Sequence, residues 1–204
     1  MNKKFFNLPK EKQCRIINAG FKVFSTYPYS RAPMSTIASE GQISKSLLFY
    51  YFNNKKELYL FLFSYANRYM DKINEREQLY LETDFFILME KIVEQKILMM
   101  AKYPYLYGFL GKAYYEQLDI VRDDIERLKK RAAMDVKNEI LNHINLDKFR
   151  YPEDISSIYD LINLTVQGYM YNKTEDAFQN SETLLKDFKN LIEPLKRNFY
   201  KKIE

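Results

Sequence analysis

Turn-forming residues are scarce in this chain, and their scarcity limits the folds that it can adopt. The 204 residues include only five Gly and six Pro. A fold of many short strands needs a turn after each strand, and Gly and Pro supply most tight turns. Long helices joined by short connections need far fewer turns. The scarcity of turn residues therefore favours an all-α fold. Of all residues, 47% are hydrophobic and 29% are charged, which is typical of globular proteins, so we expect this fold to have a buried core.

Apolar spacing predicts three short helices at the start of the chain. The first should run from about Lys10 to Ser25, because apolar or small residues recur there at intervals of three and four. These residues are Ile17, Gly20, Phe21 and Phe24. We expect the second helix near residues 33–40 and the third through about residue 52, with Ser44 as N-cap.

The remainder of the chain continues the helical pattern with longer elements. A fourth helix should begin near Lys55. Further helices are expected around residues 82–102, 104–116, 119–145, 153–173 and 181–202. The sequence thus predicts a small helical module followed by a larger helical body.

Charge is distributed unevenly between these two parts. Residues 1–56 contain ten Lys or Arg and two Glu, a net charge of +8. Since the whole chain carries +5, residues 57–204 carry −3. A basic module joined to a mildly acidic body is typical of a polyanion-binding part attached to a different kind of domain. A solvated basic face without a partner would give the same charges.

Other features argue against several classes of protein. The longest apolar runs, residues 58–63 and 85–89, are far shorter than the roughly 18 residues of a membrane span. The opening residues lack the apolar segment of a secretory signal, and a lone Cys14 agrees with a reducing compartment. One Cys and one His, His143, are too few for most metal cages. We expect a soluble cytoplasmic protein without a membrane segment, catalytic residues, metal or cofactor.

The most informative segment is residues 34–58. Two short helices joined by a tight turn at Gly41-Gln42 are typical of a helix-turn-helix. Leu48 and Phe52 share one face of the second of these helices, whereas Lys45, Ser46, Phe49 and Tyr50 occupy the adjoining face, and Tyr51 and Leu47 the other flank. Exposed rings on so short a helix are costly in water but suit contacts with thymine methyls, sugars and phosphates. An apolar helix buried on all sides is the alternative.

This segment resembles the signature of the TetR family of bacterial transcription regulators. The resemblance rests on Ile37-Ala38, residues 43–52 (ISKSLLFYYF) and residues 54–58 (NKKEL), together with the upstream Ala19-Gly20-Phe21 and Phe24. It covers about the first 58 residues. The remaining chain resembles the family in length and helix pattern alone.

The resemblance implies a DNA-binding domain at residues 1–56 and a ligand-binding and dimerisation domain at residues 57–204. The implied DNA-binding residues are Ser35, Thr36, Lys45, Ser46, Leu47, Phe49, Tyr50, Tyr51 and Lys55. Lys45, Ser46 and Leu47 would face base edges, and Lys55 would bind a phosphate at the start of the fourth helix. Tyr51 stands where the family often has a phosphate-contacting His.

Three departures from the family pattern lie in this module. The turn is Gly41-Gln42 where Ala-Gly is common, so Gln42 must adopt the turn conformation at a modest cost. Ser46 replaces a frequent Gly and Phe49 a frequent Tyr. The operator sequence therefore cannot be transferred from relatives.

The resemblance also implies that the last two helices, near 153–173 and 181–202, form the interface of a homodimer. Each carries an apolar stripe: Ile155, Ile158, Tyr159, Ile162 and Val166 on the first, and Leu184, Leu185, Phe188, Leu191, Ile192, Leu195 and Phe199 on the second. These stripes could instead fill the core of one chain. We expect Phe188 and Ile192 to lie in the interface.

Large apolar side chains between the N-terminal module and the last helices suggest a pocket for a small, largely apolar effector. The candidate contacts are Phe86, Met89, Tyr103, Tyr107, Phe109, Tyr114, Met134 and Tyr169. Any single ring of this set is more often a core residue than a ligand contact. The expected function is a ligand-released repressor that binds a quasi-palindromic operator. The alternatives are a helical protein-interaction module that has lost DNA binding and, least favoured, an enzyme that uses carboxylates alone.

Overall fold

The computed structural model describes residues 3–76, 79–171 and 180–201. This part of the chain is helical, and its only β pairing is an isolated bridge between Phe149 and Tyr200. The predicted all-α class is therefore confirmed. None of the helices in the described ranges is both long and apolar enough to cross a membrane.

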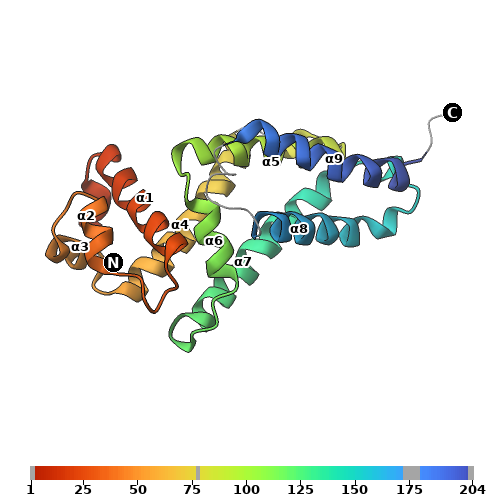
Figure 1. The fold of residues 1–204 in the computed structure, drawn as a ribbon. Coiled ribbons are helices and arrows are strands. Elements are labelled where there is room, and N and C mark those ends of the chain that lie inside the picture. The colour runs from red at the N-terminus through yellow and green to blue at the C-terminus, as the bar shows by residue number, and fades with distance from the viewer. Residues whose placement is uncertain (1–2, 77–78, 172–179, 202–204) are drawn as a thin grey trace. The chain divides into compact units, whose positions relative to one another are not determined.

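Figure 1 shows the helices in chain order. The α-helices are α1 (Lys10–Thr26), α2 (Met34–Glu40), α3 (Lys45–Phe52), α4 (Lys55–Arg76), α5 (Phe85–Lys102), α6 (Leu106–Tyr114), α7 (Asp119–His143), α8 (Ile155–Tyr171) and α9 (Ser181–Phe199). Short 3-10 helices are η1 (Lys3–Asn7), η2 (Leu79–Leu81), η3 (Leu146–Lys148) and η4 (Pro152–Asp154). The helices expected from the sequence are all present with ends that differ by a few residues, whereas η1 was not expected.

The chain divides into two compact units that do not follow a single cut in the sequence. The first unit comprises Met1–Arg68 and Tyr103–Lys130, and the second comprises Tyr69–Lys102 and Arg131–Glu204. Helices α4 and α7 therefore each begin in the first unit and end in the second. The family resemblance implies a different division, at residue 56, between a DNA-binding and a ligand-binding domain. That division stays a prediction.

Aromatic packing forms the core of the first unit. Phe21 and Phe24 of α1 are buried, as the sequence stripe predicts, and both contact the ring of Phe109 from α6, with ring centroids 5.3 and 6.2 Å away. Tyr59 of α4 contacts Phe109 at 5.2 Å. Gly20 allows α1 and α4 to approach closely, because a Cβ there would lie 2.6 Å from a methyl of Leu62, which would have to shift. Burial of this cluster joins α1, α4 and α6 into one body.

The second unit is built around α5, α8 and α9. Its buried core combines Phe85 and Phe86 of α5 with Ile158 and Ile162 of α8 and residues of α9. Asp84, just before α5, accepts hydrogen bonds from the Lys148 ammonium (2.8 Å), the Tyr200 hydroxyl (2.9 Å) and the backbone N–H of Ile87 (3.1 Å). A buried carboxylate is stable here because charged and polar donors surround it.

The apolar stripes of α8 and α9 lie within this core, which corrects one expectation from the sequence. Phe188 and Ile192 are 5% and 2% exposed and pack with α5 residues in the same chain. Ile155, Ile158, Ile162 and Leu184 are buried as well. These side chains cannot form an interface with a second chain unless the unit opens. Among the side chains that the structure describes on α8 and α9, the exposed large apolar ones are Leu161, Leu164 and Leu191.

Candidate functional site

Buried contacts between α2 and α3 hold the helix-turn-helix together. Ile37 and Ala38 of α2 and Leu48 and Phe52 of α3 are each at most 2% exposed. The Ser44 side chain accepts a hydrogen bond from the backbone N–H of Leu47 at 3.1 Å, so Ser44 is the N-cap that the sequence predicts. These contacts fix the direction in which the remaining side chains of α3 project.

The turn between α2 and α3 takes its left-handed residue at Gln42. Its φ is 52°, whereas Gly41 has a φ of −75° and closes α2. The expectation that Gln42 adopts the turn conformation is thus confirmed. The Arg15 guanidinium of α1 donates to the Gly41 carbonyl at 3.2 Å and ties this turn to α1.

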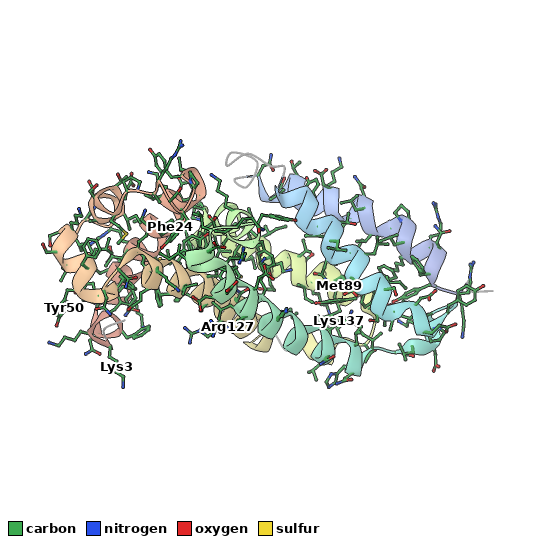
Figure 2. All side chains as sticks on the ribbon, turned by 90° about the horizontal axis from the view of Figure 1, so that it is seen from below. Lys3, Phe24, Tyr50, Met89, Arg127 and Lys137 are labelled. Atoms are coloured by element: carbon green, nitrogen blue, oxygen red, sulfur yellow. The ribbon has the colours of Figure 1, made fainter. Side chains whose placement is uncertain are left out.

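One face of the helix-turn-helix presents polar, basic and aromatic side chains to solvent. Ser35 of α2 and Lys45, Ser46 and Tyr50 of α3 are exposed, and Tyr50 is 45% exposed despite its aromatic ring. Thr36, Leu47 and Phe49 are half-buried. The Lys45 ammonium lies over the Phe49 ring, 6.0 Å from its centroid. Figure 2 shows Tyr50 projecting outward from the first unit.

Tyr51 occupies a different environment from the other candidate DNA-binding residues. Its side chain is 6% exposed, and its ring meets Phe5 edge-on with centroids 5.8 Å apart. Burial against η1 gives this residue a role in the core. Contact of its hydroxyl with a phosphate stays a prediction.

Lys55 is engaged with the loop between α1 and α2. Its ammonium donates to the carbonyl oxygens of Tyr29 (3.0 Å) and Ser30 (3.1 Å) and lies 5.4 Å from the centroid of the Tyr29 ring. Burial lowers its pKa. An ammonium has three N–H groups, so one remains for a phosphate. Removing Lys55 would therefore disturb the loop in addition to any DNA contact. The sequence does not indicate this contact between Lys55 and the loop.

The N-terminal 3-10 helix was missed because five residues are too few for a periodic signal. Its two adjacent rings, Phe5 and Phe6, were the available clue. Phe5 is fully buried against Phe52 and Phe61. The Lys4 ammonium lies over the Tyr50 ring, 5.7 Å from its centroid. Residues 3–7 thus adjoin the exposed face of α3.

The candidate effector contacts are divided between the two units. Tyr103, Tyr107, Phe109 and Tyr114 belong to the first unit, where Phe109 is fully buried and the Tyr103 hydroxyl lies 2.7 Å from that of Tyr65. Burial raises the pKa values of Tyr103, Tyr107 and Tyr114. Tyr103 and Phe109 are therefore ring contacts of the core around α1 and α6.

The other candidates belong to the second unit. Phe86 and Met89 are buried in its core. Tyr169 of α8 donates a hydrogen bond from its hydroxyl to the Asp187 carboxylate of α9. Met134 lies on α7, and its side chain is outside the described residues. The eight candidates are thus divided between the two units, and their contact with an effector stays a prediction.

Clusters of three or more His, Cys, Asp or Glu with metal-binding geometry do not occur among the described residues. The single cysteine, Cys14, is half-buried on α1 and is a free thiol.

Comparison with known proteins identifies the N-terminal module. A sequence model described as "Bacterial regulatory proteins, tetR family" matches residues 16–61. This range contains most of α1, all of α2 and α3, and the start of α4. No curated protein has a significant sequence match to the chain.

Solved structures of similar fold extend the comparison to nearly the whole chain. A TetR family transcriptional regulator from Chloroflexus aurantiacus has a TM-score of 0.68 at 16% identity, covering 98% of this chain and 99% of that protein. NalD of Pseudomonas aeruginosa, the secondary repressor of the MexAB-OprM multidrug efflux pump, has a TM-score of 0.61 at 13% identity, with 96% and 100% covered. FadR of Bacillus subtilis, solved with stearoyl-CoA, has a TM-score of 0.57 at 15% identity, with 85% and 96% covered. Residues 16–61 therefore match the N-terminal module of the tetR family, and the chain as a whole shares the fold of these solved regulators.

Proposed function

We propose that this protein is a transcription regulator whose helix α3 enters the major groove of its operator DNA. The observation that carries the proposal is the exposed face of α3, where Lys45, Ser46 and Tyr50 project from a helix fixed by the Ser44 cap and the buried Leu48 and Phe52. A rigidly held helix with basic, hydroxyl and aromatic groups suits both phosphate contact and reading of base edges. Lys45 would contribute to sequence preference, since it begins the helix.

We infer that the regulator acts as a homodimer through the exposed apolar strip of α8. Leu161 and Leu164 are 46% and 68% exposed, and a Cβ added at Gly168 would meet nothing within 4 Å. These residues are spaced at i, i+3 and i+7 and so share one face of the helix. A second copy would cover this face, and a two-fold dimer presents two α3 helices to half-sites roughly 34 Å apart.

The direction of regulation that we propose is repression released by a small, largely apolar effector. Support comes from the NalD repressor and from the stearoyl-CoA bound by FadR, two proteins of similar fold. Helix α4 runs from Lys55 in the first unit into the second unit. An effector bound in the second unit could shift the DNA-binding module through that helix. A tenfold loss of DNA affinity needs about 1.4 kcal/mol of differential binding, and operator DNA must weaken effector binding equally.

Recovery of bound genomic fragments tests this function most directly. The purified protein is mixed with sheared genomic DNA, and the retained fragments are sequenced. The affinity of the protein for the enriched sequence is then measured by fluorescence anisotropy and compared with its affinity for a scrambled duplex. We expect one quasi-palindromic sequence to be enriched and to bind more tightly than the scrambled duplex. The Lys45→Ala variant should show a different preference among duplex sequences. Weak salt-dependent binding without preference would contradict operator recognition, and no duplex binding at all would favour a protein-interaction module.

A further inference from the structure

The segment η1 lies outside the residues that the family model matches, yet it is fixed against the recognition helix. Phe5 is fully buried, with its ring centroid 5.8 Å from that of Tyr51, 5.0 Å from Phe52 and 5.4 Å from Phe61. Two of these rings belong to α3 and the third to α4. The aromatic contacts therefore hold η1 on the same elements that position the exposed face of α3.

A second tie comes from the side chain of Gln13 on α1. Its amide nitrogen donates to the carbonyl oxygens of Phe6 (3.0 Å) and Leu8 (2.7 Å), and the side chain is itself buried. The segment is thus fixed by packing on one side and by hydrogen bonds on the other. A segment ordered in the free protein adds little conformational cost when it binds a partner.

The two lysines of this segment extend the basic face of α3. Both Lys3 and Lys4 are exposed, and the Lys4 ammonium lies 5.7 Å from the centroid of the Tyr50 ring. The hydrogen bond with the Tyr50 side chain raises the pKa of Lys4. Lys45 lies in the first turn of α3 and Tyr50 in the last, so positive charge is present at both ends of the helix. Figure 2 shows Lys3 and Tyr50 at the same end of the first unit.

We propose that η1 is a second DNA-binding element, in which Lys3 and Lys4 contact phosphates at the edge of the major groove that α3 enters. The proposal rests on the proposed function, because it takes α3 as the recognition helix. Phosphates border the groove along its whole length, and lysines placed beside an inserted helix meet them without reading sequence. Phe5 acts as a positioning residue that holds the two lysines at this edge.

Salt-dependent binding to duplex DNA tests the proposal. The double variant Lys3→Ala, Lys4→Ala is compared with the parent by fluorescence anisotropy at several salt concentrations. The matched control is Lys130→Ala, Lys201→Ala, which also removes two exposed charges, from α7 and from beyond α9. We expect the η1 variant to bind specific and scrambled duplexes on the order of tenfold more weakly, with the salt slope reduced by about one unit for each phosphate that is no longer bound. The control should keep the parental slope.

The variant Lys3→Arg, Lys4→Arg distinguishes charge from structure. It should retain parental affinity and slope, because the guanidinium also binds phosphate. An alanine variant whose slope equals that of the control, while the parent binds normally, would overturn this inference and leave the proposed function intact. A parent protein that binds no duplex would instead overturn both. Circular dichroism should show equal helix content in all variants, since Lys3 and Lys4 are exposed.

Discussion

Gln42 holds the turn between α2 and α3 with a φ of 52°, a conformation in which side chains other than glycine are strained. Replacing it with glycine removes a strain of roughly 1–2 kcal/mol, offset in part by the greater freedom of glycine in the unfolded chain. We expect Gln42→Gly to raise the free energy of unfolding by about 0.5–1 kcal/mol, measured by chemical denaturation.

The adjacent position supplies the control for this substitution. Gly41 has an ordinary φ of −75°, and a Cβ there would lie 3.1 Å from the Ile37 carbonyl oxygen. Gly41→Ala should therefore destabilise the protein. If Gln42→Gly also destabilised the protein, contacts of the Gln42 side chain would contribute more to stability than the backbone strain at this turn.

Lys96 is a charged residue on an apolar face of α5. By helical spacing it shares that face with Ile92, Met99 and Met100, which are all buried. Lys96 is half-buried and has no ion-pair or hydrogen-bond partner among the described residues. Burial lowers its pKa, so the folded state disfavours the charged form.

This placement makes Lys96→Met a stabilising substitution. We expect the free energy of unfolding at pH 7 to rise by about 1 kcal/mol, because a flexible apolar side chain replaces an unpaired ammonium. The gain should be greatest below the pKa of Lys96 in the folded protein. It should shrink as pH rises toward the unfolded lysine value of about 10.4, where the parent also loses the charge. Lys186→Met, at an exposed site on α9, should leave stability nearly unchanged. If the gain in the free energy of unfolding did not vary with pH, it would come from the packing of the methionine side chain and not from removal of the charge.

At the scale of elements, helical spacing and cap residues predicted most of the fold. The stripe through Phe21 and Phe24 and the Ser44 cap locate α1 and α3 within a residue or two. Spacing shows which face of a helix is apolar but not which element covers it. For this reason Phe188 was assigned to a dimer interface, whereas it packs within its own chain. Spacing also does not indicate that Phe109 of α6 packs against Phe21, far earlier in the chain.

Asp84 connects the start of α5 with the segments that follow α7 and α9. Burial raises the pKa of its carboxyl, but hydrogen bonds from Lys148, the Ile87 N–H and Tyr200 outweigh that effect and leave the pKa below its ordinary value. A carboxyl whose pKa is lowered by folding stabilises the folded state at pH values above its pKa in the unfolded chain, about 3.9. This stabilisation is lost as pH falls through the pKa of the carboxyl in the folded protein. The parent should therefore lose stability in acid through this group.

Asp84→Asn tests this connection. We expect a loss of about 1–3 kcal/mol at pH 7, because the Lys148 ammonium loses its charged partner. The difference from the parent should narrow as pH falls below about 4. Asp147→Asn, an exposed change of the same chemistry in η3, is the control and should cost little. A difference between Asp84→Asn and parent that stayed constant from pH 7 to pH 3 would contradict the linkage.

At the scale of the whole molecule, helices α4 and α7 are each shared by the two units. Within the first unit the start of α4 is tied to the start of α7 by an ion pair of 2.6 Å between Lys56 and Asp124. Helix α6 is tied to α1 where the Lys112 ammonium donates to the Thr26 carbonyl at 3.0 Å. The helix-turn-helix thus belongs to a unit that also contains the starts of α4 and α7, and the later residues of both helices belong to the second unit.

Assembly provides the last prediction. Leu161→Asp, Leu164→Asp places two charges on the exposed strip of α8, where they cost little in one chain but would be buried without partners in a dimer. We expect light scattering to show a dimeric parent and a monomeric variant of equal helix content. The control Leu81→Asp, Leu98→Asp changes two leucines that are 73% and 64% exposed on η2 and α5, and it should stay dimeric.

The DNA affinity of these variants extends the argument from assembly to operator binding. Because a monomer engages one half-site at a time, Leu161→Asp, Leu164→Asp should lose most of its affinity for a two-half-site duplex while its affinity for a single half-site is unchanged. Phe188→Asp, in contrast, should lower the melting temperature, because it buries a charge within the second unit. A folded α8 variant that remains dimeric would show that the second copy covers a different face, and Leu191 on α9 would be the next position to test.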